Sequence, residues 1–86
     1  MKWCVYMVEC ADGTYYTGAT KNLERRLTAH NAGQGAKYLR GRRPVRLVYA
    51  KAYRNYQAVL RAEWRIKQRT RQEKETFVRA YADRCR

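Results

Sequence analysis

The chain has 86 residues, of which 45% are hydrophobic, and this composition excludes simple disorder. Two domains would leave about 40 residues each, too few to fold without metals or disulfides. We therefore expect a single domain over residues 1–86. No apolar run approaches the roughly 18–20 residues that span a bilayer, and the sequence opens without a secretory pattern. We expect a cytoplasmic protein, with association with the nucleoid as one option.

Lysine and arginine number 20 and acidic residues 7, which gives a formal net charge of +13. A field of this sign attracts polyanions. Nucleic acid is therefore the first expected partner and an anionic membrane surface the second. A basic surface that only keeps the protein soluble is the remaining alternative. The three cysteines stand at unrelated spacings, which indicates free thiols rather than a disulfide framework or a zinc site.

The first elements predict a β-hairpin. Trp3–Glu9 is rich in aromatic and β-branched residues, and Thr14–Thr17 forms the returning strand. The tripeptide Ala11-Asp12-Gly13 suits a three-residue loop whose glycine takes a left-handed conformation. With this loop length, Tyr6 and Tyr16 point from the same face of the sheet, because side chains alternate with period two. A two-residue turn would place them on opposite faces.

The middle of the chain predicts a helix, a loop and a third strand. Leu23–Asn31 follows a capping asparagine and is predicted as a helix that ends at glycines. Gly33–Pro44 is a basic loop, and Val45–Tyr53 is the third strand. Strict alternation along this strand predicts that Leu47 and Tyr49 share a face.

Two helices complete the chain. The segment from Tyr56 to about Arg69 is predicted as a helix. Thr70 and Glu73 form a capping box, so a further helix starts there and runs to about Ala82. The order β-β-α-β-α-α predicts an α+β fold in which helices pack on a small three-stranded antiparallel sheet. The apolar stripe of the first of these two helices is expected to comprise Tyr56, Val59, Leu60 and Ile66.

Glu63 falls within that apolar stripe. A buried carboxylate is unfavourable unless it is paired or holds a metal. One interpretation is an ion pair with an arginine from the sheet or from the first helix. The other is ligation of a hard divalent cation such as Mg²⁺, which often binds through one or two carboxylates together with substrate phosphate and water.

Two further pairs of residues are candidates for chemistry. Tyr6 and Tyr16 are ordinary strand residues for packing, but two phenols near cations could lose a proton more easily and act as a general base. Arg26 and His30 are one helical turn apart and form a cationic pair. That pair is either a solvated helix face or a clamp for a phosphate. His30 is the only histidine, which excludes a zinc site with several histidines.

These residues together resemble a known family. Cys4-Val5-Tyr6 and Tyr16-Thr17-Gly18 resemble the paired motif of GIY-YIG nucleases. The segments 22–26 and 30–31 resemble the first helix of that family, and Ala62-Glu63-Trp64-Arg65-Ile66-Lys67 resembles its metal-carboxylate helix. The segments 9–14 and 35–38 are most similar to the small stand-alone YhbQ-like branch, which is related to the UvrC N-terminal domain. The likeness extends over about residues 3–78.

The resemblance implies a three-stranded sheet with flanking helices and cleavage of DNA phosphodiesters with one divalent ion, Mg²⁺ or Mn²⁺. It implies that one of Tyr6 and Tyr16 activates the water while the other positions the water or the phosphate. Gly18 would permit close approach, Arg26 would stabilise charge on phosphorus, His30 would assist, and Glu63 would hold the metal. It also implies a surface that follows the DNA backbone, made of Lys37, Arg40, Arg42, Arg43, Arg65, Lys67 and Arg69.

The sequence departs from the family pattern at several positions. Cys4 replaces the first motif glycine, and Val5 and Thr17 replace isoleucines. No asparagine follows Glu63, although many members have one there. The leading expectation is an endonuclease of DNA repair or recombination that selects branched, nicked or flapped DNA through DNA shape, a protein partner or a homodimer. The alternative is a non-catalytic, basic nucleic-acid-binding module that retains the nuclease fold.

Overall fold

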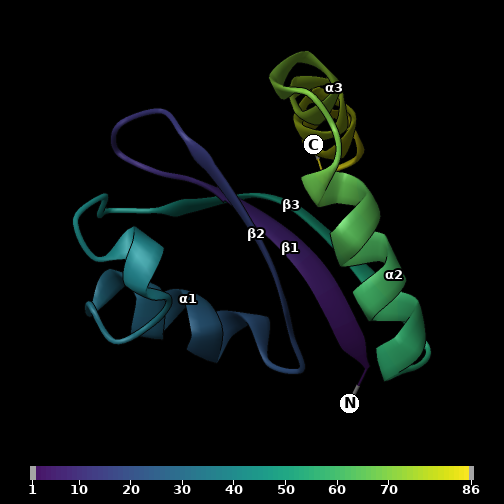
Figure 1. Cartoon of the computed structure of the whole chain (residues 1–86), viewed down its shortest axis with the longest axis horizontal. Helices are drawn as coiled ribbons and strands as arrows, with labels where there is room; N and C mark the ends of the chain where they lie inside the picture. Colours follow the sequence, from purple (N-terminus) through teal and green to yellow (C-terminus); the bar gives the residue numbers. More distant parts are fainter. Residues whose placement is uncertain (1, 86) are drawn as a thin grey trace.

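The computed structural model describes residues 2–85 and has the predicted order β-β-α-β-α-α (Figure 1). The fold is α+β, with a three-stranded antiparallel sheet and three α-helices, as the sequence predicts. A short 3₁₀ helix lies within the basic loop after the first helix. The elements are β1 (Trp3–Glu9), β2 (Tyr15–Thr20), α1 (Leu23–Asn31), η1 (Lys37–Leu39), β3 (Arg46–Tyr53), α2 (Tyr56–Lys67) and α3 (Arg71–Arg84).

β1 is the central strand of the sheet, whose order is β2-β1-β3. The hairpin between β1 and β2 has the predicted three-residue loop. The backbone N–H of Cys10 donates to the carbonyl of Thr14 over 2.8 Å, and Gly13 has a φ of +86°. The register pairs Tyr6 with Gly18, and Tyr6 and Tyr16 therefore lie on the same face. β2 extends to Thr20, beyond its predicted end at Thr17.

The prediction for the two faces of β3 is wrong for Tyr49. The pairing of β1 with β3 shifts between Met7 and Val8, which lie opposite Tyr49 and Leu47. The extra residue, Val48, forms a bulge, and a bulge interrupts the two-residue alternation. As a result Tyr49 packs into the core on the opposite side of the sheet from Leu47.

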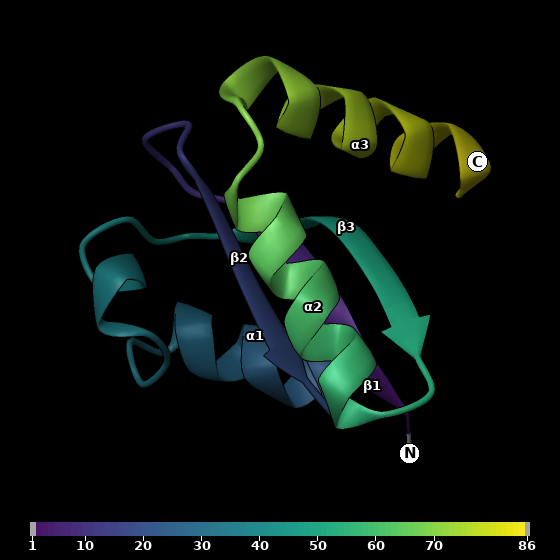
Figure 2. The same ribbon diagram turned by 45° about the vertical axis from the view of Figure 1, so that its right-hand side comes forward.

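The sheet is the middle layer of three. In Figures 1 and 2, α1 lies on one side of it, whereas α2 and α3 lie on the other. The core on the α2 and α3 side contains Val5, Met7, Val48, Tyr49, Val59, Ala62 and Ile66. The core on the α1 side contains Tyr6, Val8, Cys10, Leu39 and Val45. Two separate cores follow from the alternation of β1, whose residues 5–8 are all buried.

The buried face of α2 differs from the predicted stripe. Tyr56 and Leu60 retain 48% and 41% of their exposure, whereas the buried residues of α2 are Val59, Ala62 and Ile66. The Tyr56 ring packs instead against Trp3, with 4.6 Å between ring centroids. Glu63 consequently lies at the border of the buried face rather than inside it.

α3 starts at the predicted capping box. The Thr70 side chain accepts from the backbone N–H of Glu73, and the Glu73 carboxylate accepts from the backbone N–H of Thr70. Phe77 and Tyr81 pack on Tyr49 of β3, which attaches α3 to the sheet. None of the helices between residues 2 and 85 is both long enough and apolar enough to cross a membrane.

Candidate active site

Tyr6 lies at the centre of the candidate site. It is fully buried on the α1 side of the central strand. Its phenol oxygen lies 2.7 Å from Nε2 of His30, which projects from the last turn of α1 and is also buried. The sheet and the first helix thus converge on one hydrogen bond between two residues that are distant in sequence.

The hydrogen bonds of His30 define its protonation. The backbone N–H of Ala36 donates to Nδ1 over 3.3 Å, so this nitrogen is an acceptor without a proton. The neutral ring then carries its hydrogen on Nε2 and donates it to the Tyr6 oxygen. Burial, followed by the positive charge of Arg26, lowers the pKa of His30 below its ordinary value. The expected cationic pair of Arg26 and His30 is therefore one arginine cation beside a neutral imidazole.

Two glycines make room for this hydrogen bond. A Cβ at Gly18 would lie 2.6 Å from the Tyr6 oxygen and 2.8 Å from Cζ of the same ring. A Cβ at Gly35 would overlap Nδ1 of His30. Both distances are shorter than real Cβ contacts, so any larger residue would displace the Tyr6 or His30 ring. Gly18 was expected to let another group approach its backbone closely. In the structure the group next to Gly18 is the Tyr6 phenol.

Tyr16 is held between two rings. The edge of its ring meets His30 at a centroid distance of 5.8 Å, and Tyr38 stacks on it at 5.9 Å with 25° between the planes. The Arg42 guanidinium also lies over the Tyr38 ring, 4.2 Å from its centroid, and forms an ion pair with Asp12 in the hairpin loop. The basic loop is thereby fastened to the hairpin. Sequence reasoning gave Tyr38 no role, although its place among basic residues marked it.

Charges around Tyr6 come from three elements. Burial raises the pKa of Tyr6 to about 12, and Tyr16 and, more weakly, Glu63 also raise it. Arg26 acts in the opposite direction, since its positive charge favours the phenolate. The expectation that nearby cations ease loss of the proton does not hold for Tyr6 in the free protein, because removal from water outweighs the effect of Arg26.

Glu63 projects from α2 with 19% of its side chain exposed. Its carboxylate pairs with Nζ of Lys67 over 3.0 Å, one turn further along the same helix. The ion-pair interpretation is thus correct in kind, but the partner is a lysine of α2 rather than an arginine of the sheet or of α1. Because Lys67 is itself exposed, a competing cation can displace it from Glu63.

The ligands available for a metal are few. Among residues 2–85 no group of three or more histidine, cysteine or acidic side chains could hold an ion. A complete protein cage of the zinc type is therefore absent from this part of the chain. One accessible carboxylate fits Mg²⁺ or Mn²⁺, which retain several waters and bind substrate phosphate directly. Glu63 is the residue of the site that meets this requirement.

The seven basic residues expected to follow a nucleic-acid backbone fall in two regions, the loop after α1 and the end of α2. Three are already engaged in ion pairs, Arg42 with Asp12, Lys67 with Glu63 and Arg69 with Glu73. Arg43 donates to the carbonyl oxygens of Arg40 and Asn31. Exposed side chains among the seven include Lys37, Arg40 and Arg65.

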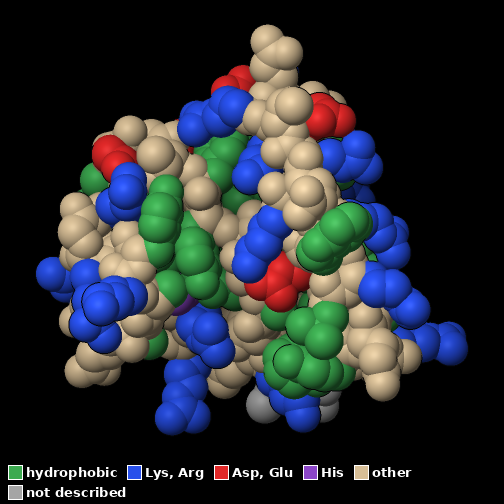
Figure 3. Space-filling model, viewed as in Figure 1, with side chains coloured by type: hydrophobic (Ala, Val, Ile, Leu, Met, Phe, Trp, Pro, Cys, Tyr) green, Lys and Arg blue, Asp and Glu red, His purple; other side chains and the backbone are tan. Residues whose placement is uncertain are grey.

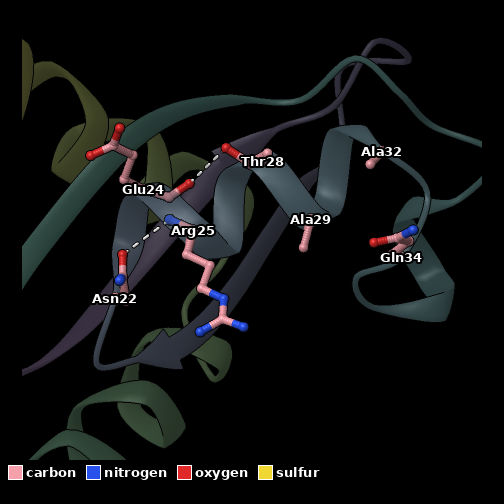
Figure 4. Close-up of a pocket in the computed structure, with 7 residues that line it drawn as sticks. All are labelled: Asn22, Glu24, Arg25, Thr28, Ala29, Ala32 and Gln34. Atoms are coloured by element: carbon pink, nitrogen blue, oxygen red, sulfur yellow. Dashed lines mark hydrogen bonds between the residues drawn. The ribbon is translucent and has the colours of Figure 1, made fainter.

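A separate hollow follows the outer side of α1 (Figure 4). The polar groups along it serve the helix itself. The Asn22 side chain accepts from the backbone N–H of Arg25, and the Thr28 hydroxyl donates to the carbonyl of Glu24. Neither candidate tyrosine lines it, and we place no chemistry there. Its lining consists of Asn22, Glu24, Arg25, Thr28, Ala29, Ala32 and Gln34.

The sequence and the fold of this chain have counterparts in known proteins. Residues 2–76 match the family model described as the GIY-YIG catalytic domain. The chain belongs to the GIY-YIG family. Within it, the chain is similar to small UPF0213 proteins. One from Streptococcus agalactiae serotype V is 49% identical over 77 residues, which cover 90% of this chain and 88% of the relative. One from Halobacterium salinarum is 52% identical over 73 residues, 85% of this chain and 95% of the relative.

Solved structures carry the same fold as this GIY-YIG chain. The solution structure of the UPF0213 protein BH0048 from Bacillus halodurans has a TM-score of 0.61 and 42% identity, and the match covers 93% of this chain and 85% of that one. The solution structure of the protein EF2693 from E. faecalis has a TM-score of 0.65 and 34% identity, with coverage of 95% and 88%. The three-stranded sheet and its helices are thus the GIY-YIG fold.

Proposed function

We propose that this GIY-YIG protein is a divalent-metal-dependent endonuclease that hydrolyses DNA phosphodiester bonds. The observation that carries the proposal is the environment of Tyr6. Its oxygen lies 2.7 Å from His30, beneath Gly18, and within the fields of Arg26 and Glu63. In the free protein burial keeps this phenol protonated. The hydrogen bond from the neutral imidazole and the nearby guanidinium are the groups that would stabilise a phenolate, the form that a general base requires.

In this proposal the Tyr6 phenol first releases its own proton to solvent, and Nε2–H of His30 and the charge of Arg26 stabilise the phenolate that remains. The phenolate then takes a proton from the attacking water and returns to the neutral phenol. Arg26 is exposed, and a phosphate would draw its guanidinium away from the phenol and open the oxygen to water. The same guanidinium then stabilises the negative charge that develops on the phosphoryl oxygens. Tyr16, fixed between His30 and Tyr38, positions the phosphate or the water.

Glu63 would hold a Mg²⁺ or Mn²⁺ ion, which would polarise the phosphate and assist departure of the leaving oxygen. Lys67, which pairs with Glu63 in this structure, would then be available to a backbone phosphate. Lys37, Arg40, Arg42, Arg43, Arg65 and Arg69 contact further phosphates, which position the substrate without reading its sequence.

The substrate class follows from how this fold can recognise DNA. Among residues 2–85, α1, α2 and α3 all pack on the sheet, and none of them stands apart from it as a recognition helix that could enter a DNA groove. Base readout needs an element inserted into a groove. We therefore propose selection of branched, nicked or flapped DNA by shape, in repair or recombination, with a protein partner or homodimer as an additional source of selectivity.

The second candidate is a basic module that binds nucleic acid without cutting it. The observation in its favour is the sequence after Glu63, where no asparagine occurs. The two candidates differ in what Glu63 does. A nuclease requires its carboxylate for cleavage but not for binding, whereas a binding module requires it for neither.

The experiment is a cleavage assay on labelled duplex, single-stranded, nicked, flapped and four-way-junction DNA and on RNA, with Mg²⁺ or Mn²⁺. The wild-type protein is compared with Glu63→Gln and with Glu75→Gln as the matched control. Glu75 pairs with Arg71 on α3, so this control makes the same change of charge in an intrahelical ion pair outside the site. We expect cleavage by wild type and Glu75→Gln only. Equal cleavage by all three would reveal a contaminating nuclease, and binding without cleavage would establish the module.

A further inference from the structure

Exposed hydrophobic side chains gather on α2 beside the candidate site. Leu60 is 41% and Trp64 64% exposed, and both line a shallow hollow together with Arg61 and Arg65. We call these four residues the tryptophan patch. Figure 3 shows hydrophobic side chains at the surface where α2 lies, with Lys and Arg side chains around them and an acidic one close by. Neither core contains any of the four, and only Arg65 has a part in the proposed function, as a contact to a backbone phosphate.

Helical geometry fixes the order of these side chains around α2. Residues four apart lie above one another on a helix, which gives one row with Leu60 and Trp64 and another with Arg61 and Arg65. Glu63 and Lys67 form a third row, which pairs over 3.0 Å. At 100° per residue the Trp64 row lies between the other two. The indole is therefore flanked by two guanidiniums on one side and by the candidate metal carboxylate on the other.

We propose that Trp64 is a stacking platform for an unpaired base of the nucleic acid, next to the phosphate that is cut. Every base has a π-face, and stacking on aromatic side chains combined with cations along the backbone is the usual way in which proteins hold single strands. Arg61 and Arg65 supply the cations beside the indole. The proposal rests on the nuclease function for the position of the cut, but the stacking is a property of the patch itself.

The size and charge of the patch favour a base over a protein. A stable protein interface buries roughly 800 Å² on each partner, whereas one aromatic side chain contributes about 150–250 Å². A second copy of this chain would also bring its own charge of +13 toward the two arginines. A base with its phosphates matches both the single ring and the two guanidiniums.

This platform gives the proposed enzyme a physical preference. A base in an intact duplex is already stacked on its neighbours, whereas a base at a flap, a nick end or a junction is free to stack on Trp64. The platform therefore favours substrates with at least one unpaired nucleotide beside the cut. Flapped DNA and duplex ends with overhangs are expected to bind better than blunt duplex.

The chain offers a direct reporter of this contact. It has two tryptophans, Trp3 and Trp64. In a Trp3→Phe protein all indole fluorescence comes from Trp64. We expect single-stranded oligothymidylate to quench this fluorescence, with EDTA present so that no cleavage occurs. A blunt duplex of two fully complementary strands and base-free polyphosphate are expected to leave it nearly unchanged.

Affinity measurements on variants separate stacking from charge. We expect Trp64→Ala to weaken single-strand binding by about 5- to 150-fold, the loss that alanine substitution of a stacking residue produces. Trp64→Phe should retain most of the affinity and Trp64→Leu should not. Tyr56→Ala is the matched control, since it removes an exposed ring of the same helix that is already packed on Trp3. Blunt-duplex affinity should be the same for all four variants.

Two results would overturn the proposal. One is an equal loss of single-strand and duplex affinity, or no loss at all, on Trp64→Ala. The other is self-association in sedimentation that Trp64→Ala abolishes, because the patch would then be a surface for a second copy. All binding is measured without metal, and again in a Glu63→Gln background. If the protein stacks bases but cleaves none of the substrates, the nuclease function is rejected and the stacking role of Trp64 is retained.

Discussion

Gly18→Ala tests whether the Tyr6 ring packs as tightly against Gly18 as the structure shows. The added Cβ would lie 2.6 Å from the Tyr6 oxygen and 2.8 Å from Cζ, well inside the 3.4 Å at which ordinary van der Waals contact begins. The Tyr6 ring has little freedom to move, because it is fully buried and hydrogen-bonded to His30 over 2.7 Å. The substitution must therefore displace the ring or the strand.

The expected cost is that of overpacking a core. Such insertions lower the free energy of unfolding by about 1–3 kcal/mol. For a domain of this size, each kcal/mol shifts Tm by about 4–8 °C. We therefore expect Gly18→Ala to lower Tm by at least about 4 °C. The rate of the proposed cleavage should fall by more than the lower stability explains, because the Tyr6 oxygen moves away from His30. Binding of DNA depends on surface cations and should be retained.

Gly41→Ala is the matched control. A Cβ at Gly41 meets nothing within 4 Å, and its backbone lacks the positive φ that disfavours alanine. There the substitution should be neutral or raise the free energy of unfolding by about 0.4–1 kcal/mol through the unfolded state. Thermal unfolding followed by circular dichroism compares the two variants with wild type. Equal Tm values for Gly18→Ala and Gly41→Ala would refute the close packing of Tyr6 beneath Gly18.

Four further predictions concern the pH responses of Tyr6 and of His30, the salt dependence of DNA binding and the Tyr38 stack. Because the pKa of Tyr6 in the folded protein is about 12, against an ordinary value of 10, its contribution to stability is complete below pH 10 and is lost as the pH rises toward 12. Urea unfolding across this pH range should therefore show a smaller loss of stability for Tyr6→Phe than for wild type. An identical loss for both proteins would contradict the raised pKa. The lowered pKa of His30 acts at the other end, so stability should fall as pH drops below 6.5, and a His30 resonance that titrates at 6.5 or above in NMR would contradict its neutral, buried state. Contact with about six phosphates predicts a slope near −5 for log K against log salt, and a slope near zero would show that DNA binding is not electrostatic. Tyr38→Ala removes the ring stacked on Tyr16, and we expect the proposed cleavage rate to fall while single-strand quenching of Trp64 persists; loss of both together would indicate that the whole loop had moved.

Local patterns were sufficient for much of the fold. The hairpin register follows from the loop length and from Gly13, and the start of α3 follows from the capping box of Thr70 and Glu73. These features depend on neighbours in sequence, so the sequence carries them directly. The motif residues Tyr6 and Gly18 likewise come together because the register of one hairpin pairs them.

Features that depend on distant contacts were not predictable. The bulge at Val48 arises from pairing with β1 and reverses the face of Tyr49. The exposed ring of Tyr56 was expected in the core, but it packs on Trp3 at the end of the sheet. Alternation and helical period describe an isolated element, and they contain no information about which part of its surface a neighbour covers.

The electrostatic state of the site was also beyond the sequence. His30 was expected to be a cation, yet the backbone N–H of Ala36 occupies its Nδ1, and this contact exists only because Gly35 lets the loop pass over the ring. The direction in which the pKa of Tyr6 shifts could not be predicted from the sequence either. It depends on how completely the phenol is removed from water, which only the packed structure defines.

Glu63 and Tyr6 both serve metal-dependent cleavage in the proposed function, and one paired measurement decides whether they do. A flapped DNA substrate is bound at saturating protein, and single-turnover cleavage is started with Mn²⁺ for wild type, Glu63→Gln and Tyr6→Phe, while the affinity of each protein for the same DNA is measured in EDTA. We expect similar affinities for all three proteins and cleavage by the wild type alone. Cleavage by Glu63→Gln at the wild-type rate, or absence of cleavage by every protein despite tight binding, would contradict the proposed function.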